Sequence, residues 1–382
     1  MSRKKTRRIG VAFVAVAGLL LLTAAAACGR APGRGTARVP QLQAALDQLV
    51  AAGVPGALAL VREGDRTIRL TSGYGNLKPK TRLRATDRFR VGSVTKTFVA
   101  TVVLQLVGEG KLALDDTIER WLPGLVPNGR AITVRQLLNH TAGLFDYLGD
   151  GDKTVERRVL SGDWDYHWKP RELVAISTAH KAKFAPGTGW SYCNTCYILL
   201  GLIVEEATGN PIAAELRTRV FEPAGLRATS LDAGPRISGR YARGYELLGA
   251  PPLVDFSALS PSFAWTAGAI TSTADDLARF YRALLDGRLL EPDLLRTMQT
   301  TVPVAGRPGW RWGLGINKRP SPCGAQWGHD GSGPGYRTWA LNSKDGRRQI
   351  VVFTNLGEDS SSESAQQALE RVLATAYCGS QP

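Results

Sequence analysis

The chain has 382 residues, of which 43% are hydrophobic and 21% charged, a composition that fits a globular protein with a substantial core. The length suits one large domain or two. The formal charge of +15 is spread along the chain, and the N-terminus indicates export, so nucleic acid is excluded as the expected partner.

Residues 1–28 have the pattern of an export signal. Basic residues precede an uncharged apolar run over residues 9–27, and small residues lead into Cys28. Small residues before a cysteine resemble a bacterial lipobox, in which Cys28 becomes a lipid-bearing N-terminus. Two alternatives remain, ordinary cleavage nearby or retention of the run as a membrane anchor, since about 18 apolar residues can span a bilayer. Each version places the remainder outside the cytoplasm, either secreted or lipid-anchored at the outer face of the cell membrane.

The folded part is expected over residues 40–378, after a Gly-, Pro- and Arg-rich tether at residues 29–39. Its first elements are a helix and a hairpin. Helical periodicity covers residues 41–52, and two strand-like runs, 57–63 and 67–72, meet at Gly64-Asp65.

Helical patterns dominate the middle of the chain, and strand patterns return near its end. A short strand at 89–91 leads into an apolar run at 94–107, which predicts a helix buried nearly all round. Further helices are expected at residues 134–139, 171–178, 196–206, 212–220, 275–285 and 362–376, and strands at 311–317, 336–342 and 349–354. The order predicts an α+β fold whose antiparallel sheet is built from both chain ends, flanked by helices, with a mostly helical subdomain inserted at about residues 110–260.

The first of three short motifs is Ser93-Val94-Thr95-Lys96, at the start of the apolar helix. A serine hydroxyl is a poor nucleophile until a base takes its proton. Positions i and i+3 share one face of a helix, so Lys96 can touch the Ser93 oxygen.

Tyr192-Cys193-Asn194 supplies a second candidate base. For Tyr192 to act as a phenolate near neutral pH, its pKa must fall by about 3 units, and a nearby Lys96 ammonium can supply much of that shift. This predicts a rate that rises into mildly alkaline pH. Asn194 can hydrogen bond both Lys96 and an amide carbonyl of the substrate.

The third motif is His329-Asp330-Gly331, followed by Ser332. Glycine at 331 allows a strand edge to approach the substrate closely. The backbone N–H groups of Ser93 and Ser332 are candidates for an oxyanion hole. Asp330 is expected to be a solvated carboxylate in a turn.

These motifs stand in the order Ser-x-x-Lys, Tyr-x-Asn, Lys/His-x-Gly, which resembles the serine β-lactamase/D-alanyl-D-alanine carboxypeptidase family, nearest the class C β-lactamases. The resemblance runs from about residue 40 to residue 376. Two secondary signatures agree, LLNHTAGL at 137–144 and AGAITSTADDL at 267–277. The resemblance implies acylation of Ser93, proton transfer shared by Lys96 and Tyr192, and an oxyanion hole completed by the N–H of Ser332.

The resemblance also narrows the expected activity. His329 stands where true β-lactamases commonly carry lysine, whereas carboxypeptidases and esterases of the family often carry histidine. A mostly neutral histidine lowers the pKa of Tyr192 less than lysine does, so efficient β-lactam hydrolysis is not expected. The implied function is an extracytoplasmic D-alanyl-D-alanine carboxypeptidase acting on peptidoglycan stem peptides, with β-lactams as covalent ligands. An esterase, a weak β-lactamase, and a penicillin-binding sensor that barely turns over are the alternatives.

No cofactor or metal is expected, because the four histidines lack the spacing of a zinc site. Cys323 and Cys378 are candidates for a disulfide that ties the last helix to the sheet, while Cys193 and Cys196 form either a small disulfide or two buried thiols. His140 is expected to be structural. Residues 164–168 (WDYHW) either rim the substrate cleft or pack as a loop over the helical subdomain.

Overall fold

A computed structural model describes residues 34–231 and 234–379 of the chain. The expected signal segment, including Cys28, lies outside the described residues, so its lipid anchor stays a prediction. Within the described ranges, the structure contains no helix with the length and apolarity needed to cross a membrane.

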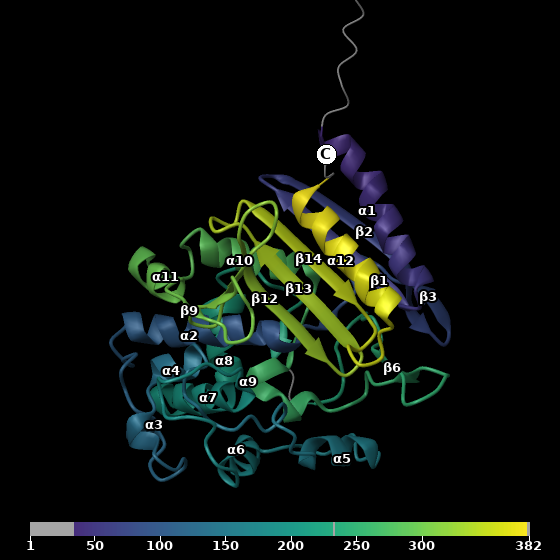
Figure 1. Cartoon of the computed structure of the whole chain (residues 1–382). Coiled ribbons are helices and arrows are strands. Elements are labelled where there is room, and N and C mark those ends of the chain that lie inside the picture. The colour runs from purple at the N-terminus through teal and green to yellow at the C-terminus, as the bar shows by residue number, and fades with distance from the viewer. Residues whose placement is uncertain (1–33, 232–233, 380–382) are drawn as a thin grey trace, which may run out of the picture.

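The centre of the molecule is a nine-stranded antiparallel sheet made from both chain ends, which confirms the predicted fold class (Figure 1). The two contributions meet where β1 pairs with β14, with Ala57 opposite Thr354. In spatial order the strands are β3 (Lys80–Arg82), β2 (Arg66–Leu77), β1 (Gly56–Glu63), β14 (Arg348–Thr354), β13 (Tyr336–Asn342), β12 (Gln326–Gly333), β11 (Asn317–Arg319), β10 (Arg311–Trp312) and β9 (Val302–Pro303).

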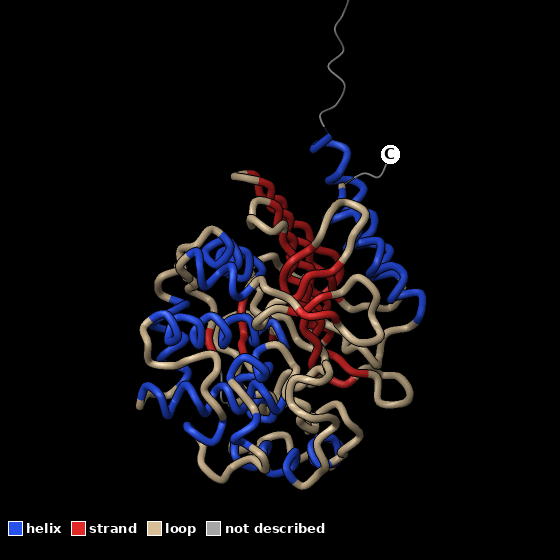
Figure 2. The backbone as a smooth tube through the Cα atoms, turned by 60° about the vertical axis from the view of Figure 1, so that its left-hand side comes forward, coloured by secondary structure: helices blue, strands red, loops and turns tan. Residues whose placement is uncertain are grey.

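Helices cover both faces of this sheet, so the fold has three layers (Figure 2). Side chains of a strand alternate between faces. On β1, Leu58 and Leu60 join the larger core, while Ala57, Ala59 and Val61 join the smaller one. Strands buried on both faces are apolar almost throughout, which explains the continuous apolar runs in the sequence.

The smaller core lies under the two terminal helices, α1 (Arg34–Ala51) and α12 (Glu363–Cys378), which pack side by side on one face (Figure 1). α1 begins at Arg34, so residues 34–39 are helical and not part of a flexible tether. Buried Arg38 explains the difference, because its guanidinium donates to the Ala376 carbonyl and to Glu63 Oε1. Near this end of α12, Cys378 forms a disulfide with Cys323.

The larger core surrounds α2 (Thr95–Gly108), whose side chains are buried over nearly its whole length, as predicted. α7 (Asn194–Thr208) and α10 (Ala274–Leu285) contribute to the same core. Around them lie η1 (Gly92–Val94), α3 (Ile118–Trp121), η2 (Gly129–Ala131), α4 (Val134–Leu138), α5 (Thr154–Leu160), α6 (Pro170–Thr178), α8 (Ile212–Leu216), η3 (Arg217–Phe221), η4 (Pro261–Phe263), α9 (Trp265–Gly268) and α11 (Pro292–Met298).

Two small sheets complete the fold, and one of them fixes the entry to the first motif. β4 (Phe89–Arg90) pairs with β8 (Ile270–Ser272), which also pairs with β5 (Ser230–Leu231). The register places Arg90 opposite Thr271, so the chain just before Ser93 is held against the 267–277 signature. The second small sheet joins β6 (Tyr245–Glu246) and β7 (Val254–Asp255).

The strand predicted over residues 311–317 is wrong in detail. It is two short strands, β10 and β11, joined by a turn that contains Gly313 and Gly315. Gly315 has φ of +74°, and a Cβ there would come within 2.3 Å of the Ala100 Cβ on α2. The turn therefore needs glycine both for its backbone conformation and for its close approach to the helix.

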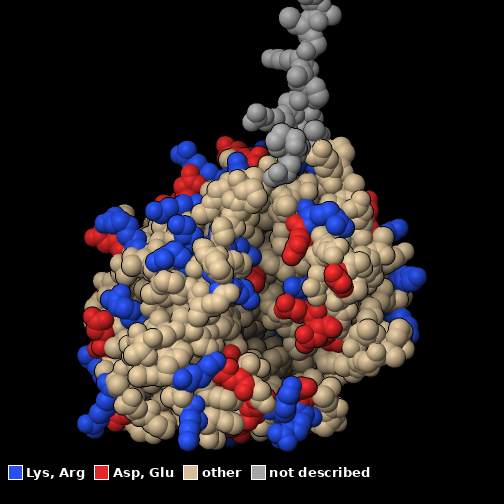
Figure 3. Space-filling view, in the orientation of Figure 1, with Lys and Arg blue, Asp and Glu red and all other residues tan. Residues whose placement is uncertain are grey.

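The visible face of the molecule carries Lys and Arg interspersed with Asp and Glu (Figure 3). No single block of one sign covers this face, in agreement with the spread of charge along the sequence. A hollow lies near the centre of the same view.

Candidate active site

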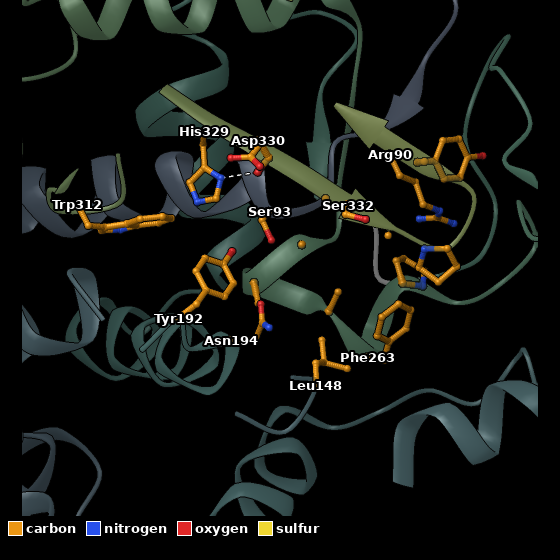
Figure 4. A pocket seen from close by; sticks show the side chains of 18 of the residues that line it. Arg90, Ser93, Leu148, Tyr192, Asn194, Phe263, Trp312, His329, Asp330 and Ser332 are labelled. Carbon is orange, nitrogen blue, oxygen red and sulfur yellow. Dashed lines mark hydrogen bonds between the residues drawn. The ribbon is translucent and has the colours of Figure 1, made fainter. Parts of the chain in front are cut away.

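All three motifs converge on one pocket of about 420 Å³. Ser93, Tyr192, Asn194, His329 and Ser332 all line it. Figure 4 shows Ser93 at its centre, with Tyr192 and His329 on one side and Ser332 on the other. Ser93 lies in η1, Asn194 begins α7, and His329 and Ser332 lie on β12, whereas Tyr192 lies in the irregular stretch before α7.

Ser93 lies in the short turn η1, directly before α2. Gly92 precedes it with φ of +54°, and a Cβ on Gly92 would lie 2.7 Å from the Ser332 carbonyl oxygen and 2.9 Å from the Ser332 nitrogen. Glycine at 92 therefore allows β12 to run close against the turn that carries the nucleophile.

Lys96 lies one helical turn after Ser93 and is fully buried. Its ammonium nitrogen Nζ is 3.0 Å from Ser93 Oγ, 2.8 Å from Asn194 Oδ1 and 2.7 Å from the Ala267 carbonyl oxygen. Burial lowers the pKa of Lys96 to about 7, against the opposing effect of Asp146 and Asp330. At neutral pH a large share of Lys96 is therefore a neutral amine that can accept the Ser93 proton.

Tyr192 presents its hydroxyl toward Ser93 (Figure 4). Burial raises the pKa of Tyr192 well above its ordinary value, although hydrogen bonding with Ser93 opposes the shift. This direction is opposite to the lowered pKa that the sequence predicts from a nearby Lys96 ammonium. A neutral phenol at Tyr192 can relay a proton to a leaving group, and Lys96, whose pKa is lowered to about 7, is able to accept the Ser93 proton near neutral pH.

Asn194 is the first residue of α7, and its amide is held at both ends. Oδ1 accepts from Lys96, and Nδ2 donates to Asp146 Oδ2 at 2.9 Å. Asp146 is almost fully buried, and burial raises its pKa. The sequence pointed to Asn194 but gave no signal for Asp146, which lies in a loop after the 137–144 signature.

The edge of β12 faces the turn that carries Ser93. A Cβ on Gly331 would lie 1.9 Å from the Val91 carbonyl oxygen and 2.9 Å from the Ser93 nitrogen, so only glycine fits there. β12 and β13 are joined by a two-residue turn, which makes Gly333 and Tyr336 a hydrogen-bonded pair. Alternation along the ladder then directs the N–H of Ser332 away from β13 and toward Ser93, where it can serve an oxyanion hole with the N–H of Ser93.

His329 is buried beside Tyr192, with ring centroids 6.3 Å apart. Burial lowers the pKa of His329 to about 4, so the imidazole is neutral in the physiological range. Its Nδ1 lies against the Asp330 carbonyl oxygen, which assigns the proton to Nδ1 and leaves Nε2 as an acceptor.

Asp330 lies within β12 and not in a turn, contrary to the expectation from the sequence. Its carboxylate is 3.7 Å from the guanidinium of Arg319, a buried residue on β11. Burial opposes ionisation of Asp330, but Arg319 and His329 hold the pKa of its carboxyl below the usual range. Asp330 is therefore charged at neutral pH and faces a partner across the strands.

Comparison with known proteins follows from this geometry. The profile of the Beta-lactamase family matches residues 42–374. The chain belongs to the beta-lactamase family. It is 28% identical over 340 residues to penicillin-binding protein 4* of Bacillus subtilis, an alignment that covers 83% of this chain and 72% of that protein.

Solved structures of the family agree in fold. A D-stereospecific amidohydrolase from Streptomyces superposes with a TM-score of 0.81 at 38% identity, covering 90% of this chain and 99% of the other. A D-amino acid amidase from Ochrobactrum anthropi SV3, in complex with D-phenylalanine, gives a TM-score of 0.79 at 30% identity over 90% and 99% of the two chains. The chain is thus a serine hydrolase of the β-lactamase and penicillin-binding protein family.

Two sides of the pocket differ in chemistry. The side of Tyr192 and His329 is also lined by Trp310, Trp312 and Arg307, and a leaving group placed there could receive a proton from Tyr192. An acyl group would then face the opposite side, where Figure 4 shows Phe263 and Arg90. Other apolar lining residues there are Leu148, Phe256, Leu259 and Pro261. None of these wall residues belongs to the three motifs, so the sequence does not predict them as part of the site. Arg90 and Trp312 lie on the short strands β4 and β10, and Pro261 and Phe263 lie on η4.

Hydrogen bonds and ring packing from outside the pocket hold the wall of the acyl side in place. Arg90 Nη2 donates to the carbonyl oxygens of Pro235 at 2.9 Å and Leu259 at 3.2 Å. Trp164 packs on Phe256 with ring centroids 4.8 Å apart, and the Trp168 N–H donates to Ser262 Oγ. Residues 164–168 thus support the wall of the pocket from outside and do not line it.

Proposed function

We propose that the protein hydrolyses the D-alanyl-D-alanine bond of peptidoglycan stem peptides through an acyl-enzyme on Ser93. In the first step, the neutral Lys96 amine takes the Ser93 proton, Ser93 Oγ bonds to the carbonyl carbon, and the N–H groups of Ser93 and Ser332 stabilise the oxyanion. The proton taken up by Lys96 then reaches the departing D-alanine nitrogen through Tyr192, which gives up its own proton and receives the one from Lys96. In the second step the neutral Lys96 takes a proton from water, the hydroxide oxygen bonds to the acyl carbon, the Ser93 Oγ–acyl bond breaks, and the proton returns to Ser93 Oγ.

The distribution of charge in the pocket is the observation that carries this proposal. On the leaving-group side, Arg307 lines the wall, and its guanidinium lies 5.0 Å from the Trp310 ring. It supports recognition of the carboxylate of a terminal D-alanine. Asp330 is the one carboxylate among the described lining residues, and it lies on this side too. Because the Arg319 guanidinium faces Asp330, its negative charge is partly balanced.

The acyl side supports an acyl donor without a free ammonium. Arg90 is the charged residue among its described lining residues, and a positive charge there disfavours a second cation. A stem peptide, whose acyl residue is amide-linked, meets this condition. A free D-amino acid amide, which carries an ammonium beside the scissile bond, does not.

The test compares three substrates on one preparation: an N-acetylated peptide ending in D-alanyl-D-alanine, the same peptide with a terminal carboxamide, and D-phenylalanine amide. We expect release of D-alanine from the first substrate at the highest kcat/KM, and no release by Ser93→Ala. Arg307→Gln should raise KM for the carboxylate peptide while changing the carboxamide peptide little. Fastest cleavage of D-phenylalanine amide would contradict the proposal.

That outcome defines the second candidate, a D-amino acid amidase. The 38% identity to the Streptomyces D-stereospecific amidohydrolase favours it. An esterase or weak β-lactamase, or a sensor acylated by penicillin without turnover, uses the same first step. Intact-mass spectra with a penicillin separate these, since a lasting adduct on Ser93 indicates slow deacylation and hydrolysed penicillin indicates a β-lactamase.

We also propose that the protein is exported and anchored through a lipid on Cys28, on the strength of the basic, apolar and small-residue order of residues 1–28. Cell-wall peptides are then within reach of the pocket. In a bacterial host, the wild-type chain should fractionate with membranes and incorporate labelled palmitate. Cys28→Ala should abolish the label, and an equally labelled variant would contradict the anchor.

A further inference from the structure

Tyr192 lies in a stretch without regular secondary structure, residues 189–193, although the chemistry requires its hydroxyl at a fixed place. The residues on either side of it are held by one side chain and one carbonyl. The Ser191 N–H donates to the His140 carbonyl oxygen at 3.1 Å, and the Cys193 N–H donates to His140 Nδ1, also at 3.1 Å. His140 therefore brackets Tyr192, and their rings lie 4.6 Å apart between centroids.

His140 itself is fixed by the fold. It is fully buried, with φ of +64°, a conformation that few non-glycine residues adopt. Burial lowers its pKa well below the ordinary value, so Nδ1 stays an acceptor over the working range of pH. His140 is thus a fixed point to which the residues on both sides of Tyr192 are hydrogen bonded.

The second fixed point is a disulfide. Cys193 is bonded to Cys196, and both are buried in the larger core. Cys193 is the residue before α7, and its Sγ accepts the N–H of Cys196 at 3.0 Å. The bridge joins the irregular stretch that carries Tyr192 to the first turn of the helix that carries Asn194.

We propose that the Cys193–Cys196 disulfide is a positioning element of the active site. With Cys193 tied to α7 on one side and to His140 on the other, the two flanking residues, Tyr192 and Asn194, keep a fixed separation around Lys96 and Ser93. This inference rests on the proposed nucleophile, Ser93, but not on the identity of the acyl donor. Both sulfurs are buried, so the bridge acts through geometry and not through exchange with other thiols.

The decisive variant is Cys193→Ser/Cys196→Ser. Serine is a preferred residue at a helix N-cap, so this variant removes the bridge but keeps a capping side chain on α7. The second disulfide provides the matched control, Cys323→Ser/Cys378→Ser, which opens a bridge outside the pocket lining. The probe is p-nitrophenyl acetate, which needs little recognition, so failure of the peptide assay leaves this test intact.

We expect kcat per titrated active site to fall at least tenfold in Cys193→Ser/Cys196→Ser, with KM changed less than threefold. The control should keep kcat within twofold. A role in stability alone would lower the unfolding midpoint in both variants but leave kcat per folded site unchanged. A kcat within twofold of wild type in the first variant would therefore overturn the proposal.

His140 offers a second route, should the double variant fail to fold. Asparagine tolerates positive φ and carries an acceptor oxygen, whereas alanine lacks the acceptor. We expect His140→Ala to lose at least tenfold in kcat and His140→Asn to recover most of it. Equal losses in the two variants would show that the bond to the Cys193 N–H does not set the rate, and would overturn the bracket.

Discussion

Asn194 Nδ2 donates a hydrogen bond to Asp146 Oδ2 at 2.9 Å, and this contact fixes which end of the amide faces Lys96. Because Nδ2 is held by Asp146, Oδ1 is presented to the lysine at 2.8 Å. Asp146 thus acts on Lys96, the proposed base, in two ways: through the orientation of Asn194, and through its own negative charge, which raises the pKa of Lys96.

Replacement of Asp146 should move the acidic limb of the pH profile. Asp146→Asn removes the charge that favours the ammonium form of Lys96, so the pKa of Lys96 falls further below about 7. The active neutral amine then persists to lower pH, and the midpoint of kcat/KM should shift down by about 0.5 to 1 unit. The control is Asp152→Asn, which removes a carboxylate that is paired with His180. This variant should leave the midpoint of kcat/KM unchanged.

The wild-type profile follows from the same base. Lys96 must be neutral, so kcat/KM should rise between pH 6 and 8 with a midpoint near its pKa of about 7. His329, with its pKa lowered to about 4, should add no inflection above pH 5. Stopped-flow measurement of ester hydrolysis at a series of pH values, with Ser93→Ala as the background, gives this profile. A flat profile from pH 5 to 9 would rule out Lys96 as the base, and Lys96→Arg should be inactive because guanidinium does not deprotonate.

The acyl side of the pocket should select by size. Phe263 lines it, and its truncation in Phe263→Ala should lower kcat/KM for a phenylacetyl ester by about 10- to 200-fold. An acetyl ester does not reach this wall, so its kcat/KM should change less than about threefold. Phe263→Leu restores apolar volume and is the matched control. Equal losses for both esters would point to a general distortion of the site.

The Cys323–Cys378 disulfide should contribute to stability more than to activity. It closes a loop with a sequence separation of 55, for which chain entropy predicts about 4 kcal/mol, with about 2–4 kcal/mol typically measured. Urea unfolding of Cys323→Ser/Cys378→Ser should show a loss of this size in the free energy of unfolding. An unchanged unfolding midpoint would mean that the bridge is absent in solution or that α12 is held by packing alone.

The sequence predicted the local half of the site and little of the rest. The contact between Ser93 and Lys96 depends on helical spacing, which a sequence displays directly. Contacts of Lys96 with Asn194 and with the Ala267 carbonyl join segments far apart in the chain. The side-chain chemistry of the second motif predicts the first contact, but nothing in the sequence predicts the second. The direction in which the pKa of Tyr192 shifts does not follow from the sequence, because the burial that raises it arises from packing against Trp312 and His140. The same is true of Asp330, whose partner Arg319 lies on a neighbouring strand.

The pairing of β1 with β14 has a consequence for synthesis of the chain. The strand at Gly56–Glu63 leaves the ribosome long before its neighbour in the sheet, Arg348–Thr354. Ser93 and Lys96 emerge early too, whereas the oxyanion donor Ser332 lies on a strand that needs β13 and β14 beside it. Such long-range closure is slow compared with local helix formation. A chain that has not yet reached Thr354 therefore carries Ser93 without the strands that position the Ser332 N–H, and the proposed site is complete only after β14 has joined the sheet.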